Sequence, residues 1–489
     1  MIFEIKWMIG TVIVLLMNFQ NTDGATKVIF SGCSKNGFSC ITKPNKNIAL
    51  TYTCPNGMND VSIYINDFAS PINTESLKIE NCNILTISTS CTAARKSMHT
   101  LHIVNIKKLI FVKVTQDPML PATVLVENVS YIDSIPEKTF QQINKATYPR
   151  GCFQQTNDFQ NISFKNVTIN TVEPSAFIAT NNFKNFSFSN VKINHIRADA
   201  IKLKLDLSGT CEVRNSTIKL MEYLAMVTTA KTIIFTGNYF AEILPNGIGG
   251  TFENFYFIKN VVETLQAHAL SLLGTNIFIL DNKFSHLRGN ALEKLSPGLL
   301  QYSGHSFGKL KFIYDFSKNE LNFVDAAALH PDYVSYENVQ TDMMFSRNKF
   351  LCTCENLAWM FSPLSHGPDG VQLEDFYKMI LDESYANTCS TPAGKSCKVP
   401  LKSVTHLIKC GKCLKNVTLE SICDGIDGFE EKNQSETTTD SFDVSSEAIL
   451  PGEMQTHQNK SLDSSAGVGK RFITYVNVFG LIAIWYALQ

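Results

Sequence analysis

The chain has 489 residues, of which 44% are hydrophobic and 10% aromatic, and this is enough apolar material for a large core. Its 43 Lys and Arg residues nearly balance its 44 Asp and Glu residues, so the formal net charge is −1. A chain without a basic excess has no general attraction for polyanions, and we expect no nucleic-acid partner.

A short apolar run lies near the N-terminus, at residues 7–17 (WMIGTVIVLLM). The run is too short to span a bilayer, but its length is typical of the hydrophobic core of a secretory signal peptide. Small residues follow it in the string NTDGA. We therefore predict a signal peptide over residues 1–24 and entry of the chain into the secretory pathway.

Sequons and cysteines agree with export. An Asn-x-Ser/Thr sequon in an exported chain predicts an N-glycan at the surface. The sequons place candidate glycans on Asn128, Asn161, Asn166, Asn185, Asn215, Asn416, Asn433 and Asn459. Cysteines of an exported chain are expected to form disulfides rather than to remain free thiols. The disulfide candidates are Cys33, Cys40, Cys54, Cys82, Cys91, Cys352, Cys354, Cys389, Cys397, Cys410, Cys413 and Cys423.

The middle of the chain repeats one short pattern. In FENFYFIKNVVETLQAHAL and in TNIFILDNKFSHLRGNAL, an apolar-x-apolar string is followed by two residues and an Asn. The Asn recurs first every 22 residues and then less regularly, at Asn238, Asn260, Asn282, Asn319 and Asn348. In earlier copies the same slot is taken by Val167, Val191 and Ser216. The pattern is the leucine-rich-repeat frame with Phe and Ile often replacing Leu.

Such a repeat has a direct physical interpretation. Alternate side chains of the apolar-x-apolar strand point inward, and the Asn side chain satisfies backbone groups where the chain leaves the strand. One unit cannot bury its own apolar face, so the units must stack into a solenoid. We expect about ten irregular repeats over residues 100–350.

With this frame, the chain resembles extracellular leucine-rich-repeat proteins, the broad group that includes Toll-type ectodomains, Slit, connectin and chaoptin. The resemblance implies an α/β solenoid of mostly parallel strands, with an irregular convex side and a cysteine-rich cap at each end. It places a cysteine-containing N-terminal cap at residues 25–99 and a C-terminal cap at residues 351–425.

The string RNKFLCTCENLAW, at residues 347–359, puts Cys352 and Cys354 directly after the last repeat. Neighbours one residue apart are poorly placed to bond each other, so each is expected to pair with a cysteine between Cys389 and Cys423. A zinc site or a redox C-x-x-C pair involving Cys410 and Cys413 competes poorly with structural disulfides in an oxidising compartment. The pair is therefore interpreted as part of a lid on the solenoid.

No strong catalytic motif stands out. The string GHSFG at residues 304–308 matches a nucleophile elbow, but it lies in an insertion between repeats without the strand and helix that the motif requires. Cys211 lies at a core-facing strand position and is expected to be a buried free thiol. We expect neither an enzyme nor a bound metal or cofactor.

The residues between the inward positions of each strand point to the concave, solvent-facing side. On three neighbouring strands these positions are apolar: Ile234, Tyr256, Ile258, Phe278 and Leu280. Exposed apolar and aromatic clusters of this kind mark interaction sites, so we predict that a partner protein binds here. A register error of one residue would turn the same side chains inward.

The C-terminal part changes composition. Residues 426–464 are rich in Ser, Thr and acidic residues, as expected of a flexible stalk, and the segment 465–489 ends in an apolar tail. Small residues before the tail resemble a GPI-attachment signal, with Ser464 and Ser465 as candidate lipid-attachment sites. The alternative is a single short membrane span over residues 472–488. Either anchor would hold the protein at the outer face of the plasma membrane.

Three functions remain open. The first is a membrane-anchored recognition protein that binds a protein ligand or receptor at the cell surface, in cell adhesion or as a co-receptor without its own signalling domain. The second is innate-immune or soluble-ligand recognition on the same scaffold. The third is a carbohydrate-active enzyme on a parallel β-helix, which would require clustered Asp, Lys or Arg on one outward strand face.

Overall fold

The computed structural model describes residues 26–28, 33, 36–44, 47–56, 59–65, 74–89, 98–113, 121–141, 160–298, 310–325, 327–329, 339–357, 379–390 and 399–402. All of them belong to the first of two compact units, Met1–Lys432. The predicted signal peptide, stalk and C-terminal anchor lie outside the described residues, as does GHSFG. So do the candidate sites Cys91, Cys397, Cys410, Cys413, Cys423, Asn416, Asn433, Asn459, Ser464 and Ser465.

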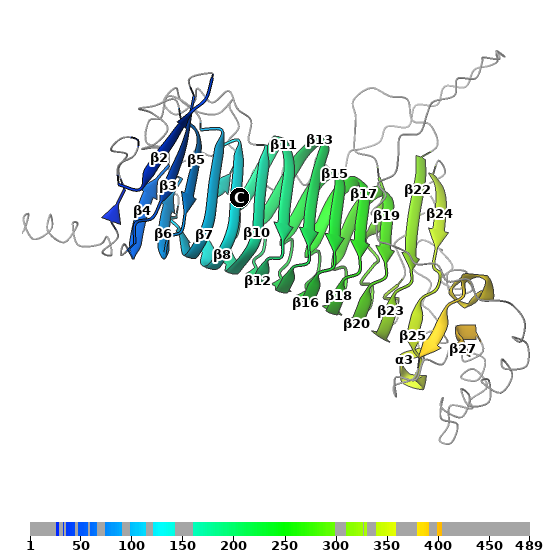
Figure 1. Cartoon of the computed structure of the whole chain (residues 1–489). Helices are drawn as coiled ribbons and strands as arrows, with labels where there is room; N and C mark the ends of the chain where they lie inside the picture. Colours follow the sequence, from blue (N-terminus) through cyan, green and yellow to red (C-terminus); the bar gives the residue numbers. More distant parts are fainter. Residues whose placement is uncertain are drawn as a thin grey trace, which may run out of the picture. The chain divides into compact units, whose positions relative to one another are not determined.

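The described chain forms a parallel β-solenoid (Figure 1). One series of long strands stacks turn upon turn, each strand pairing in parallel with the long strand of the next turn. The long strands are β7 (Thr100–Phe111), β8 (Thr123–Ile135), β10 (Asn161–Val172), β11 (Phe177–Ser189), β13 (Ile201–Arg214), β15 (Met226–Thr236), β17 (Ile248–Ile258), β19 (Leu270–Leu280), β22 (Leu310–Ser317) and β24 (Val339–Met344).

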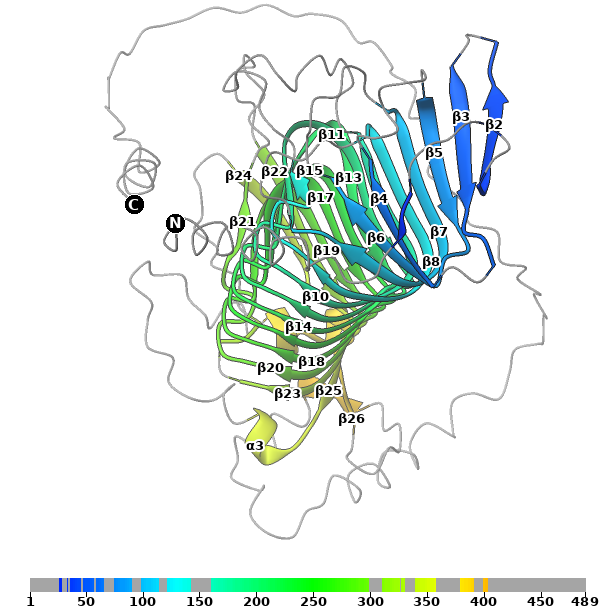
Figure 2. The ribbon, with the colours of Figure 1, turned by 90° about the vertical axis from the view of Figure 1, so that its left-hand side faces the viewer.

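A second series of short strands follows the corner after each long strand from β11 onward. It comprises β12 (Lys192–Ile196), β14 (Thr217–Met221), β16 (Tyr239–Ile243), β18 (Val261–Leu265), β20 (Lys283–Leu287), β23 (Glu320–Val324) and β25 (Lys349–Leu351). These strands also pair in parallel from turn to turn. Figure 2, turned by 90°, shows successive turns one behind another, with the short strands forming a side of their own.

This second strand series corrects the expected α/β class with an irregular convex side. The described residues contain almost no helix, only short pieces such as α3 (Cys354–Leu357) and the 3-10 turn η2 (Glu383–Tyr385). The segments after the corners bury their second and fifth residues, as Phe240 and Ile243 do in Tyr239–Ile243, and neighbouring copies are in register. The parallel stacking of turns of unequal length, offset by 22 residues between β16 and β18 and by 37 between β20 and β23, brings these extended segments side by side. Their backbone groups are therefore satisfied by strand pairing.

Stacked apolar rows form the core between the strand series. In one row, Phe257, Phe284, Phe316 and Phe345 are all buried. Their ring centroids are separated by 6.3, 6.1 and 4.7 Å along this row. Phe257 and Phe316 lie on the long strands β17 and β22, and Phe284 lies on the short strand β20, so rings from both strand series meet and the core continues along the stack.

Parallel stacking begins before residue 100. The N-terminal segment contains β1 (Thr26–Lys27), β2 (Phe38–Thr42), β3 (Ile48–Thr53), β4 (Asp60–Tyr64), β5 (Thr74–Glu80) and β6 (Ile84–Ser88). Strand β3 pairs in parallel with β5, and β5 with β7, while the antiparallel strand β2 flanks β3. The disulfide Cys54–Cys82 joins the ends of β3 and β5, and Cys33–Cys40 closes a short loop at β2. The cysteine-containing segment is therefore continuous with the solenoid.

Two ladders of asparagine side chains run along the corners after the long strands. The inner asparagine ladder, which is buried, consists of Asn238, Asn260, Asn282, Asn319, Asn348 and Asn387. The outer asparagine ladder, which is exposed, consists of Asn81, Asn105, Asn128, Asn166 and Asn190. Every outer residue has a φ between 53° and 61°, a left-handed conformation that Asn tolerates well.

The outer ladder gives way to the inner one between Asn215 and Asn238. Ser216 begins the inner series, because its backbone N–H donates to Asn238 Oδ1 at 2.9 Å. At the next corner Gly237 has a φ of 67°, and a Cβ added there would lie 2.6 Å from Asn215 Oδ1. Glycine therefore suits this corner for two reasons, its left-handed backbone and its contact with Asn215.

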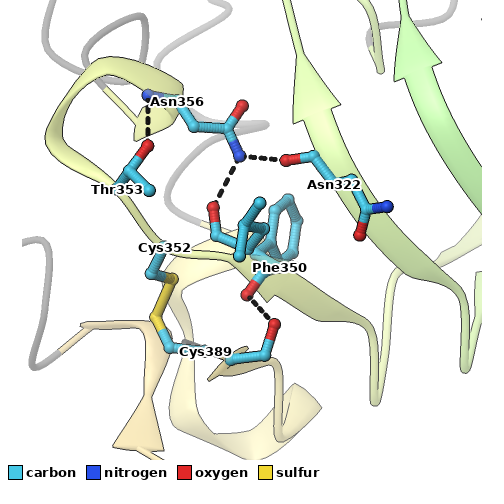
Figure 3. Close-up of a disulfide and its surroundings, with 8 residues drawn as sticks. Asn322, Phe350, Cys352, Thr353, Asn356 and Cys389 are labelled. Carbon is cyan, nitrogen blue, oxygen red and sulfur yellow. Dashed lines mark hydrogen bonds between the residues drawn. A yellow bond between two sulfur atoms is a disulfide. The ribbon is translucent and has the colours of Figure 1, made fainter. Parts of the chain in front are cut away.

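Near the C-terminal end of the described strands, a disulfide joins Cys352 to Cys389 (Figure 3). This bond agrees with the predicted pairing of Cys352, whereas the side chain of Cys354 is not described. The bond joins the end of β25 to β26 (Thr388–Ser390), which pairs in parallel with β25 and antiparallel with β27 (Val399–Pro400). Beside it, Asn356 Oδ1 accepts the backbone N–H of Val324 at 2.8 Å, and Asn356 Nδ2 donates to the carbonyls of Asn322 and Leu351.

Candidate protein-binding face

The strand register brings the predicted binding residues together on one face. Ile234 pairs with Tyr256, and Tyr256 with Phe278, on strands β15, β17 and β19. Ile258 pairs with Leu280 two residues further along. These five residues are half-buried, whereas their neighbours along the strands, such as Phe255 and Phe257, are fully buried. We call Ile234, Tyr256, Ile258, Phe278 and Leu280 the apolar patch.

The centre of the apolar patch is an aromatic pair. The rings of Tyr256 and Phe278 stack with their centroids 5.1 Å apart and an interplanar angle of 8°. Each ring is supported from below by a fully paired β-sheet, so it loses little freedom when a partner binds. Rigid, half-exposed aromatic side chains of this kind are favoured binding hot spots.

Polar residues border the patch on its N-terminal side. Ile234 pairs with Glu212, which forms an ion pair with the exposed Arg214. One turn further, Ser187 Oγ donates to Ser163 Oγ at 2.8 Å. The patch is therefore bounded by polar side chains on its N-terminal side.

The described sequon residues lie toward the N-terminal side of this patch. Asn185 Nδ2 donates to Asn161 Oδ1 at 2.8 Å, and these two residues are register partners on β11 and β10. Asn185 is exposed and Asn161 half-buried. Asn128, Asn166 and Asn215 are exposed at corners, and Asn166 Nδ2 donates to Asn128 Oδ1 at 2.9 Å. Glycans at these residues would leave the apolar patch uncovered.

A pocket adjoins the patch on its C-terminal side. Its volume is about 630 Å³, and Leu280 belongs to both the pocket and the patch. Its lining also includes Asp315, Lys318, Met344, Arg347 and Tyr385. Phe278 pairs with Asp315 and Asp315 with Met344, so the same outward row leads from the patch into the pocket.

Sequence reasoning did not find this pocket as a unit. The outward positions Asp315 and Met344 follow the strand alternation, but Tyr385 comes from η2, far along the chain from β22. The backbone N–H of Arg347 donates to the carbonyl of Tyr385 at 2.7 Å, which holds this turn against the solenoid. Arg347 and Tyr385 are far apart in the sequence, so no local sequence pattern predicts their contact.

The described residues offer little for covalent or metal chemistry. No group of three His, Cys, Asp or Glu side chains in this part of the chain is arranged to hold a metal ion. Cys211 is a free, buried thiol, and burial raises its pKa to about 12, so it is a poor nucleophile at neutral pH. Among the same residues, no helix combines the length and apolar character that crossing a bilayer requires.

Comparison with protein-family models, curated proteins and solved structures finds no match to this chain.

Proposed function

We propose that this protein is an extracellular recognition protein of the leucine-rich-repeat type, which binds a partner protein through the apolar patch. It would act in cell adhesion or as a co-receptor without its own signalling domain. The observation that carries the proposal is the stacked pair Tyr256 and Phe278, held half-exposed in a row with Ile234 and bordered by polar residues on the N-terminal side. A partner that covers this row would remove aromatic and aliphatic surface from water at little entropic cost.

The leucine-rich-repeat assignment is supported by the inner asparagine ladder. From Asn238 to Asn282 the residues recur at 22-residue intervals, and each donates its side-chain N–H to a carbonyl of a preceding strand. The assignment of residues 351–425 to a C-terminal cap draws support from Cys352–Cys389, since a bond at the last turn keeps the exposed end of the core covered.

The residues of the pocket fit the binding of a protein better than the cleavage of a carbohydrate. The described lining brings Asp315, Lys318 and Arg347 together, which is the composition that a carbohydrate-active site would use. Glycoside hydrolysis generally requires a pair of carboxyl groups, and Asp315 is the one carboxylate of the described lining. Asp315 also accepts a hydrogen bond from Ser317 Oγ within its own strand.

Attachment to the outer face of the plasma membrane is part of the proposal, with a GPI anchor at Ser464 or Ser465. Cells expressing the full chain should release it into the medium on treatment with a phosphatidylinositol-specific phospholipase C. Retention of the protein on the treated cells, while a known GPI-anchored protein is released, would favour the single membrane span instead.

The binding face is tested by photo-crosslinking on living cells. The crosslinking amino acid p-benzoylphenylalanine replaces Tyr256 in one variant of the full chain and Tyr239 in another. Tyr239 is a matched control, because it is also a solvent-facing tyrosine, 37% exposed, but lies on the short strand β16. We expect a discrete protein adduct from position 256 that an excess of unlabelled wild-type protein suppresses. Equal adducts from both positions would contradict the proposed face.

A further inference from the structure

The pocket beside the apolar patch is lined by apolar side chains and by more positive than negative charges. Leu280, Met344 and Tyr385 supply apolar surface, and Met344 is 47% exposed. Two cations, Lys318 and Arg347, and one carboxylate, Asp315, also line it, which leaves a net charge of 2 − 1 = +1. Methionine side chains are adaptable, so this surface suits a flexible ligand better than a rigid one.

The two cations are held at equivalent corners of successive turns. Lys318 and Arg347 have φ values of 61° and 57°. The backbone N–H of Lys318 donates to the carbonyl of Ser346 at 2.9 Å, so the two corners are joined. Both side chains are exposed, and neither forms an ion pair with any other described residue. They are therefore available to an anionic group of a partner.

We propose that this pocket binds an acidic peptide segment of the partner protein, in which a carboxylate reaches Lys318 and Arg347 while a neighbouring apolar side chain packs on Leu280 and Met344. This inference rests on the proposed function, since the pocket continues the same outward row. The favoured contact is charge-assisted, because a guanidinium and an ammonium face one carboxylate at the rim of an apolar surface.

The spacing between the strands determines how far apart the apolar residue and the acidic residue lie in such a peptide. Leu280 and Lys318 belong to adjacent turns, about 4.8 Å apart, and Arg347 lies one turn further, about 9.6 Å from Leu280 along the stack. An extended peptide advances about 3.3 Å per residue. The apolar side chain and the carboxylate are therefore expected to be separated by about one to three residues in the partner.

The experiment selects peptides from a phage-displayed random library on the purified full-length protein. Peptides from the selection are then resynthesised with a fluorophore, and their affinities are measured by anisotropy for three proteins: wild type, the double variant Lys318→Glu/Arg347→Glu, and the control Lys231→Glu/Lys259→Glu. The control carries the same change in charge. Lys259 occupies an equivalent left-handed corner outside the pocket lining, and Lys231 is exposed on β15. Circular dichroism and thermal unfolding confirm that each variant is folded.

We expect selected peptides to contain Asp or Glu within three residues of a large apolar residue. Their affinity should fall at least tenfold for Lys318→Glu/Arg347→Glu and less than twofold for the control. Failure to recover peptides, peptides without an acidic bias, or equal affinity for all three proteins would overturn the inference. Binding of polygalacturonate fragments through Lys318 and Arg347 in preference to every peptide would also overturn it. The crosslinking test at Tyr256 does not depend on any of these outcomes, so the proposed function and this inference can fail separately.

Discussion

Asn260 and Asn282 are joined by a forked hydrogen bond. The backbone N–H of Asn260 donates to Asn282 Oδ1 at 2.8 Å, and Asn260 Nδ2 donates to the same oxygen at 3.1 Å. Asn260 Nδ2 also donates to the carbonyl of Phe235 at 3.0 Å, while Asn260 Oδ1 accepts two N–H groups of Asn238. Each buried asparagine thus satisfies the corners of two turns at once, which links the turns along the stack.

Asn260→Ala should strongly destabilise the solenoid. The substitution leaves the carbonyl of Phe235 and the backbone N–H of Asn238 buried without their partners, so we expect the free energy of unfolding to fall by about 3–5 kcal/mol. Chemical denaturation followed by circular dichroism measures this loss. The control is Asn190→Gly, which removes an exposed rung of the outer ladder but keeps the left-handed backbone, and it should lose about 1 kcal/mol or less. Equal losses would show that the inner ladder has no special role.

The disulfide Cys352–Cys389 is expected to stabilise the C-terminal turns. It closes a loop with a sequence separation of 37 residues, and the double variant Cys352→Ala/Cys389→Ala should therefore lose about 3–4 kcal/mol. Hydrogen exchange localises the effect: amides of β25 and β26 should exchange faster in the variant, while those of β15 and β17 keep their protection. Uniformly faster exchange along the stack would instead show that this end determines the stability of the whole solenoid.

The stacked rings of the apolar patch should be energetically coupled in the free protein. A double-mutant cycle of Tyr256→Ala and Phe278→Ala is expected to give a coupling free energy of about 1 kcal/mol, since the ring centroids are 5.1 Å apart. Each single substitution should destabilise less than a fully buried aromatic, such as Phe257→Ala, for which about 3–5 kcal/mol is expected. No coupling would indicate that the two rings do not stack in solution.

Burial of Cys211 predicts a dependence of stability on alkaline pH. Its pKa is raised from 9.0 to about 12 by burial, so between these values the unfolded chain loses a proton that the folded chain retains. The stabilising contribution is complete below pH 9 and decreases as the pH rises toward 12, by about 1.4 kcal/mol per pH unit at most.

Denaturation at several pH values tests this dependence against Cys211→Ala, which lacks the titrating group. The free energy of unfolding of the wild type should fall more steeply with pH than that of Cys211→Ala. The comparison uses the slopes, because the substitution also changes the stability by an amount that does not depend on pH. Parallel curves for the two proteins would mean that the thiol titrates normally. In the native protein at pH 8, Cys211 should also resist alkylation until the chain is unfolded.

The sequence predicts the repeating unit well, because burial depends on local alternation. The inward position of Phe257 follows from this alternation, and the 22-residue period of Asn238, Asn260 and Asn282 is visible directly in the sequence. The pattern does not predict the short-strand series, since pairing between turns depends on the register of segments far apart in the chain rather than on any one segment.

The N-terminal turns illustrate a second limit. There the repeat slot holds Val167 or Val191 instead of Asn. The asparagine one residue earlier forms the outer ladder instead, as Asn166 and Asn190 do. The preference of Asn for left-handed corners is the signal that would have identified it. The pocket with Tyr385 depends on a long-range contact, so no local pattern predicts it.

The most direct test of the proposed binding face compares two aromatic pairs on the same solenoid. The double variant Tyr256→Ala/Phe278→Ala removes the centre of the apolar patch. The control Tyr239→Ala/Phe323→Ala removes residues of the short-strand series that are 37% and 47% exposed. The measured quantity is the affinity of each purified protein for the partner identified by crosslinking. We predict that the affinity of the patch variant falls about 30-fold or more, which corresponds to about 2 kcal/mol of binding free energy, and that the affinity of the control changes little. Unchanged affinity of a correctly folded patch variant would contradict the account.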